Sequence, residues 1–292
     1  MYRALADAIR EAESQGKTLS QVALERESED QGRSVEEIRA SLTRALEVMR
    51  GAIGDGATGD LRSASGLVGG DAAKLFNQAA GPLADTLFRD ILARALAVQE
   101  VNAAMGVIVA APTAGGAGTL PAVLTGLAKA RSIPDEKVID ALATAGLVGA
   151  VIAERASLSG AEGGCQAETG AGAAMAAAAA TEMLGGTPTQ AGHAVALTMQ
   201  GMLGLVCDPL GGLVELPCVF RNATGSAIAL AGIEMALAGI TFAIPADEVI
   251  DVMGEIGKEM DVRYRETAGG GLAATPTGRR LARERLYQIR RS

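Results

Sequence analysis

The three cysteines of this chain are the side chains whose type and spacing could do chemistry. Cys165, Cys207 and Cys218 follow the spacing C-x41-C-x10-C, and each lies beside Gly or Pro rather than inside an apolar helix. Loops of this kind can bend thiolates around an inorganic cluster and direct backbone N–H groups at the sulfurs. Three thiolates without a fourth Cys or a His close by in the sequence suggest a [4Fe–4S] cluster with one open iron. Such an iron is a Lewis acid that can bind a carboxylate and a hydroxyl and help the hydroxyl leave.

Other interpretations of the cysteines stay open at this level. Free Cys packs as a small hydrophobic residue, so the three could be unrelated buried thiols. A zinc ion bound by three Cys would need a fourth ligand. The single His of the chain, His193, lies on a predicted helix with no motif around it. A lone helical His is more often structural than catalytic, and we interpret His193 in that way.

Two segments rich in small residues are candidates for binding a small anion. They are residues 111–121 and 63–71. A helix is expected to start after Thr119 or Pro121, and backbone N–H groups at such a start suit a carboxylate or a phosphate. No Lys-Ser or Lys-Thr pair follows the glycines, so the first segment is not a Walker A loop. Tight helix packing explains the glycines equally well.

The composition argues against several other functions. One His among 292 residues excludes a His-rich zinc enzyme, and aromatic residues at 2% leave no stacking surface for nucleic acid. The net charge of −8 disfavours a large phosphate-binding face, so no nucleic-acid partner is expected. None of the five lysines lies in a motif typical of a pyridoxal-phosphate Schiff base, so we expect no pyridoxal phosphate.

The same sequence predicts a cytoplasmic protein without a membrane span. Acidic residues come early and no apolar stretch follows them, which is unlike a signal peptide, and three cysteines do not suggest a secreted disulfide framework. Residues 103–128 carry no charge, but prolines and a glycine-rich run would break a spanning helix. Residues 141–153 are apolar but too few to cross a bilayer.

The elements that must position these residues are predicted to be helices throughout. We expect an all-α fold: an N-terminal helical arm over residues 1–50 and a compact multi-helix body over residues 51–292, with glycine-rich loops. Capping boxes at Thr18 and Ser34 start two arm helices, and Gly51 is expected to end the second. No run of alternating β-branched residues predicts a strand.

Helix starts recur along the body. Thr187 offers an N-cap with Pro at the next position, and Pro134 and Pro245 precede acidic first turns. Residues 171–184 are nearly all Ala, Met and Thr, which predicts a strong helix. The last 14 residues hold six arginines, typical of a solvated helix face or of a docking surface for an acidic partner.

Taken together, the motifs resemble the α chain of the bacterial iron–sulfur L-serine dehydratases. The similarity runs over nearly the whole chain and includes all three cysteine contexts. The matching stretches are Glu100–Gly106, Ala111–Gly115, Ser159–Glu168, Leu203–Pro209, Glu215–Cys218 with Arg221–Ala223, and Arg265–Ala273.

This resemblance implies an all-α catalytic domain whose [4Fe–4S] cluster is held by Cys165, Cys207 and Cys218. It implies a carbon–nitrogen lyase of amino-acid degradation and gluconeogenesis that converts L-serine to pyruvate and ammonia. It also implies a separate β chain, and a homo- or hetero-oligomer. Single-chain relatives carry a Gly-His motif, regarded as a source of the catalytic base, in the domain that corresponds to the β chain. His193 does not match that motif, so the base is unassigned here, and a partner chain is one source for it.

Two further features of those relatives are altered or absent. Some end in a Cys that can cap the open iron, whereas this chain ends in Arg-Arg-Ser. Some carry a Glu-His-Asn triplet where this chain has Gln200-Gly201-Met202. The preference for L-serine over L-threonine is not specified by these motifs.

For the substrate we predict contacts from Ser65 and Gly66 in one loop and from Thr113, Ala114 and Gly115 in the other. These loops would hold the carboxylate and the ammonium group. Glu162 and Glu168 flank the first cysteine and could orient it, contact substrate, or have only a structural role. Two alternative functions remain, an iron–sulfur hydro-lyase acting on a hydroxy acid and a non-enzymatic iron–sulfur-binding protein.

Overall fold

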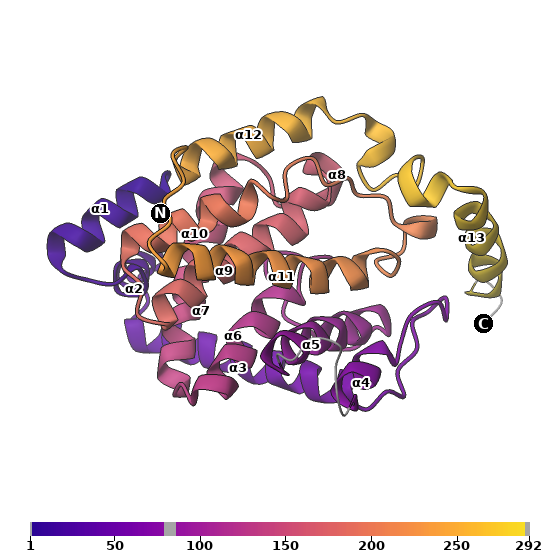
Figure 1. The fold of residues 1–292 in the computed structure, drawn as a ribbon, viewed down its shortest axis with the longest axis horizontal. Coiled ribbons are helices and arrows are strands. Elements are labelled where there is room, and N and C mark those ends of the chain that lie inside the picture. Colours follow the sequence, from indigo (N-terminus) through magenta and orange to yellow (C-terminus); the bar gives the residue numbers. More distant parts are fainter. Residues whose placement is uncertain (1, 79–85, 290–292) are drawn as a thin grey trace.

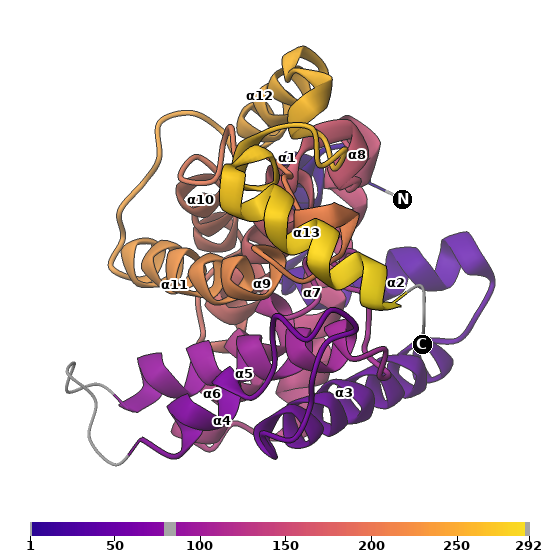
Figure 2. The same ribbon diagram turned by 90° about the vertical axis from the view of Figure 1, so that its right-hand side faces the viewer.

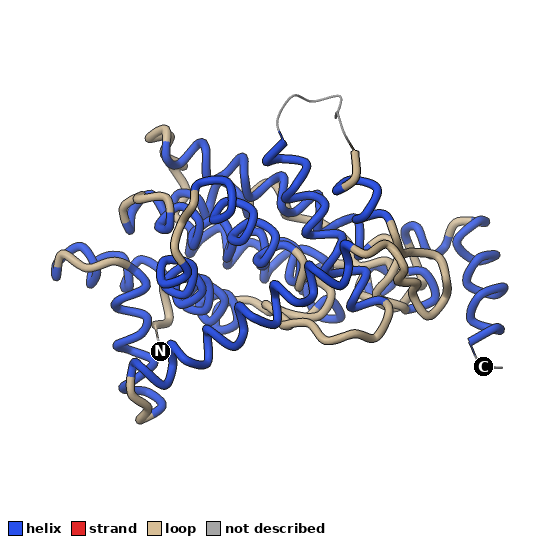
Figure 3. Tube along the Cα trace, turned by 90° about the horizontal axis from the view of Figure 1, so that it is seen from below, coloured by secondary structure: helices blue, strands red, loops and turns tan. Residues whose placement is uncertain are grey.

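The computed structural model describes residues 2–78 and 86–289, and within these ranges the chain is built from helices without a named strand (Figures 1 and 3). The all-α prediction is therefore confirmed. The α-helices are α1 (Leu5–Gln15), α2 (Leu19–Gln31), α3 (Val35–Ala57), α4 (Asp71–Phe76), α5 (Thr86–Ala103), α6 (Thr119–Arg131), α7 (Asp135–Arg155), α8 (Gly160–Gly163), α9 (Ala171–Met183), α10 (Pro188–Met199), α11 (Cys218–Leu237), α12 (Ala246–Glu259) and α13 (Pro276–Ile289). The short elements are the π-helix η1 (Gln166–Gly170) and the 3-10 helices η2 (Leu210–Gly212), η3 (Val262–Tyr264) and η4 (Gly271–Ala274).

The local helix-start signals act as predicted. Thr18, Ser34 and Thr187 each accept a hydrogen bond from the backbone N–H three residues later, and that residue's side chain accepts one from the backbone of the cap. Pro134 and Pro245 are the N-cap residues of α7 and α12. The three capping boxes work without tertiary help because each satisfies otherwise unpaired N–H groups within one turn.

The expectation that Gly51 ends the third helix is wrong. Helix α3 continues to Ala57, and its last turns bury Ala52, Ile53 and Gly56. A Cβ at Gly56 would lie 2.3 Å from the carbonyl oxygen of Ala97 in α5, so this is a close helix crossing that requires glycine. Tertiary packing of this kind outweighs the roughly 1 kcal/mol that a mid-helix Gly costs. The division of the chain at residue 50 thus falls inside a helix, and it stays a prediction.

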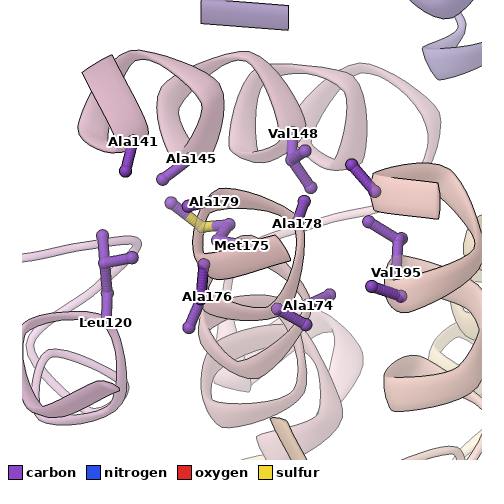
Figure 4. Close-up of a cluster of buried hydrophobic side chains, with 14 of the residues drawn as sticks. Leu120, Ala141, Ala145, Val148, Ala174, Met175, Ala176, Ala178, Ala179 and Val195 are labelled. Atoms are coloured by element: carbon purple, nitrogen blue, oxygen red, sulfur yellow. The ribbon is translucent and has the colours of Figure 1, made fainter. Parts of the chain in front are cut away.

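The alanine-rich helix α9 lies among other helices in the buried core (Figure 4). Ala171 to Thr181 are all buried, and α7, α10, α11 and α6 pack around them. Alanine side chains allow helices to approach closely while losing almost no side-chain entropy. The N-terminal end of α9 continues directly from η1, so the packed helix fixes the position of the segment that carries the first cysteine.

The N-terminal and C-terminal helices attach at different sides of this core. The carboxylate of Asp247 at the start of α12 accepts hydrogen bonds from the backbone N–H groups of Leu5 (2.8 Å) and Ala6 (3.0 Å), which anchors the start of α1. Helix α13 projects at the other end and packs on η2 and η4 (Figures 1 and 2). No helix in the part of the chain that the structure describes has the length and hydropathy needed to span a bilayer.

Candidate functional site

The three cysteines converge on one buried site. Cys165 immediately precedes η1, Cys207 lies in the loop after α10, and Cys218 is the first residue of α11. All three are free thiols with between 1% and 3% of their surface exposed. Burial raises the pKa of each thiol, and the charge of Cys165 raises the pKa of Cys207 and Cys218 further. The thiols are therefore near enough to one another to interact electrostatically.

Backbone contacts fix the segments that carry Cys207 and Cys165. The N–H of Cys207 donates to the carbonyl of Tyr264 (2.8 Å), and its own carbonyl accepts from the N–H of Glu266 (2.8 Å). This isolated bridge ties the Cys207 loop to the segment after α12. Before Cys165, Gly164 adopts a φ of 75°, and a Cβ there would lie 2.8 Å from the Met260 sulfur. Glycine is therefore required for this turn.

Arg221 holds the three cysteine segments together. It lies one turn after Cys218, and its guanidinium donates to the carbonyl of Val206 (2.7 Å) and pairs with Asp208 (2.8 Å). Its hydrogen bond and charge also lower the pKa of Cys165, opposing the larger effect of burial. Asp208 in turn accepts from the N–H of Leu272 (2.6 Å). A single cation thus contacts the segments of all three thiols.

Glu168 places a carboxylate beside the thiols. Its Oε1 accepts from the hydroxyl of Thr113 (2.6 Å), and its Oε2 lies 3.9 Å from the sulfur of Cys207. Burial raises the pKa of this carboxyl. Cβ atoms at Gly115 and Gly160 would lie 2.8 Å and 2.5 Å from its oxygens, so both glycines make room for it. Glu162, the other flanking acid, is exposed and accepts from the hydroxyl of Ser157 (2.6 Å).

The 113–118 loop is held in place by Asn222 of α11. The Asn222 amide donates to the carbonyl of Gly115 (2.7 Å) and of Cys218 (3.0 Å), and its oxygen accepts from the N–H of Gly118 (2.9 Å). The backbone N–H groups of Ala114 and Gly115 donate to no described residue. These two residues, which are predicted to contact the substrate, therefore keep free backbone N–H donors close to Glu168.

The 63–71 loop is joined to the last cysteine segment by a buried carboxylate. Glu215 accepts from the hydroxyl of Ser63 (2.7 Å), the N–H of Ser65 (3.0 Å) and the hydroxyl of Ser65. Gly66 is exposed, and its N–H donates to the carbonyl of Ser63 (2.9 Å). The donors of Ser65 and Gly66 are thus used within the chain, and a substrate contact from them stays a prediction.

His193 lies apart from these residues. It is on α10, where its Nδ1 accepts from the N–H of Phe242 at 3.4 Å, and it lines a cavity formed with the start of α1. Among the described residues, no group of three or more His, Cys, Asp or Glu side chains is arranged to hold a single metal ion.

Sequence reasoning missed the roles of Arg221, Asn222 and Glu215. All three lie within the stretches that carry the family resemblance, but most of their partners lie from 13 to 152 positions away along the chain. The sequence offered one signal, and it concerns Arg221 and Asn222. These residues lie three and four positions after Cys218, so they share its face of a helix.

A family model described as the serine dehydratase alpha chain matches residues 14–273. This chain belongs to the serine dehydratase alpha chain family. A family relative from Bacillus subtilis (strain 168), named probable L-serine dehydratase, alpha chain, is 47% identical over 97% of this chain and 95% of its own length. The L-serine dehydratase, alpha chain, of Peptoniphilus asaccharolyticus is 41% identical over 91% of this chain and 92% of its own. The L-serine dehydratase of Streptomyces coelicolor is 39% identical over 93% of this chain but only 60% of its own length. The resemblance identified from the motifs is confirmed.

Proposed function

We propose that this chain is the catalytic alpha chain of an L-serine dehydratase that converts L-serine to pyruvate and ammonia. Family membership and the names of the relatives support this activity. The observation that carries it is the convergence of three buried thiols, 42 and 11 positions apart along the chain, on one glycine-lined site. We further propose a separate β chain as partner, an oligomeric enzyme, and a cytoplasmic location without nucleic-acid or membrane partners.

The donor set fits a [4Fe–4S] cluster held by Cys165, Cys207 and Cys218. Burial, mutual repulsion and the nearby carboxylates of Glu168 and Glu266 all raise the pKa of Cys207, so bare thiolates are disfavoured here. Positive iron would offset that repulsion, and soft thiolates are the ligands that iron–sulfur centres take. When bound, the cluster supplies Lewis acidity at its open iron for the departure of the substrate hydroxyl.

The residues of this chain bind and orient the substrate. The free N–H groups of Ala114 and Gly115 suit the substrate carboxylate, since successive backbone donors form an anion-binding concavity. Thr113 donates its hydroxyl to Glu168, which fixes the carboxylate of Glu168 beside the sulfur of Cys207. Asn222 keeps the loop in register with the Cys218 helix. The group that removes the Cα proton is unassigned within this chain.

Anaerobic reconstitution with iron and sulfide tests the proposal. The chain together with its β chain should develop the broad visible absorption of an iron–sulfur centre and form pyruvate from L-serine. Cys165→Ser should lose the absorption and the activity. A matched control is Ser226→Ala, which removes a buried hydroxyl from α11 away from the thiols and should retain both. Cluster uptake without pyruvate formation from L-serine would show that the activity is wrong.

A further inference from the structure

A second cavity lies on the outer side of the Cys165 segment. It has a volume of about 290 Å³ and is enclosed by α8, the start of η1, α12 and the chain after η3. Helix α12 runs along α8 in this region (Figure 1). Its walls are mostly Ala and Gly, and its charged residues are Glu162, Lys258 and Arg265. The cavity is therefore small, largely apolar and marked by a few charges.

Two cations in this wall have no partner among the residues that the structure describes. The guanidinium of Arg265 is partly buried and forms no side-chain hydrogen bond or ion pair with any described residue. Its Nε is fully enclosed without an acceptor. The ammonium of Lys258 likewise has no partner in the described ranges. Because a partly buried guanidinium without a counter-charge is unfavourable, the wall beside Arg265 is suited to an anion, and the exposed Lys258 adds a second positive charge.

The acid in the wall does not supply that counter-charge. Glu162 accepts a hydrogen bond from Ser157 (2.6 Å), and neither Arg265 nor Lys258 pairs with it. The wall therefore carries two cations, Arg265 and Lys258, and one carboxylate that is hydrogen-bonded to Ser157. Its net charge is positive.

The cavity is separate from the thiol site. None of the three cysteines lines it. Helix α8 lies between the two, because a Cβ on Gly160 would point at Glu168 and the Cys207 sulfur, whereas Ala161 and Glu162 face the cavity. The backbone of Arg265 nevertheless forms the bridge to Cys207. An anion held by the Arg265 side chain would therefore be bound by a residue that pairs directly with one of the three cysteines.

We propose that this cavity is a binding site for a small carboxylate with a short aliphatic body, held by Arg265 and Lys258. The planar guanidinium fork matches the two oxygens of a carboxylate, and the lysine adds a second charge. The methyl and thioether walls of Ala156, Ala161, Ala167 and Met253 suit an aliphatic body. They would leave further oxygens of a phosphate without donors, so a carboxylate is favoured.

Calorimetric titration of the full chain with acetate and propionate at constant ionic strength tests the site. Lys258→Gln is the main variant, because Lys258 is exposed and its loss should not disturb folding. It should weaken carboxylate binding about tenfold, which corresponds to one charge-assisted hydrogen bond. Arg265→Gln should abolish binding, and Ala161→Leu should block it sterically with both cations intact. The matched control, Arg263→Gln, removes an exposed arginine that pairs with Asp261 outside the cavity and should bind as the wild type does.

Three results would overturn the proposal. One is equal carboxylate affinity of the wild type and Lys258→Gln, which would place any bound carboxylate elsewhere, including the thiol site. The second is a carboxylate effect no larger than that of chloride at the same ionic strength. The third is tighter binding of inorganic phosphate than of propionate, which would show that the ligand class is wrong.

Discussion

Replacing Asn222 with Asp tests whether a single amide joins the substrate loop to the Cys218 helix. The side chain is fully buried, and its amide nitrogen donates at 2.7 Å to Gly115 and at 3.0 Å to Cys218. Asn222→Asp keeps the acceptor for the N–H of Gly118 and nearly the same shape, but it turns the donor into an oxygen that faces two carbonyl oxygens.

The cost follows from these contacts. The carbonyl of Gly115 loses its shortest hydrogen bond and keeps only a 3.5 Å contact with the Gln99 amide, and a poorly satisfied buried group costs about 1–3 kcal/mol. The carbonyl of Cys218 stays within helix α11, so the loss of its hydrogen bond from the Asn222 side chain adds about 1 kcal/mol. We expect Asn222→Asp to lower the free energy of unfolding by about 2–4 kcal/mol, which lowers the melting temperature by roughly 5–10 °C. A displaced loop should also reduce kcat/KM for L-serine about 100-fold.

Urea unfolding under anaerobic conditions and pyruvate formation with the β chain measure the two effects. The matched control is Ser226→Ala, one turn further along α11, where the lost hydroxyl bond to the carbonyl of Asn222 (2.9 Å) should cost at most about 1 kcal/mol. Wild-type stability and activity in Asn222→Asp would refute the role assigned to this amide.

Two further substitutions test one buried and one partly buried carboxylate, Glu215 and Glu182. Glu215→Ala should lower the free energy of unfolding by about 2–4 kcal/mol, because three donors of the 63–65 segment lose their acceptor, whereas Ser63→Ala should cost only about 1 kcal/mol. Equal urea midpoints for the two variants would contradict this. Burial raises the pKa of Glu182 in the folded protein, even though it accepts hydrogen bonds from the N–H of Ser20. The folded state therefore holds this proton more tightly than the unfolded state, and the stability that this carboxyl contributes is lost as pH rises from its ordinary value through the folded pKa. Glu182→Gln does not titrate, so its stability relative to the wild type should increase as pH rises above the ordinary range of a glutamate carboxyl, about pH 4. A difference independent of pH, measured by urea unfolding at several pH values, would show that the carboxyl is not perturbed.

The sequence by itself determined the helices and the family. Capping boxes at Thr18, Ser34 and Thr187 specify helix starts through hydrogen bonds that span three residues, so no distant contact is needed. The alanine run of α9 predicts a helix by propensity alone. The cysteine contexts are continuous stretches of the chain, so the resemblance to the family depends on no contact between distant residues.

Only the tertiary structure decided where those pieces meet. Gly51 carries a local stop signal, yet α3 passes through it because Gly56 packs on α5. The links from Glu168 to Thr113, Glu215 to Ser65 and Asn222 to Gly115 join residues from 55 to 150 positions apart, and the three thiols come together from 11 to 53 positions apart. Such contacts depend on how closely helices approach across the alanine core. That is a property of packing between distant segments, and no local pattern encodes it.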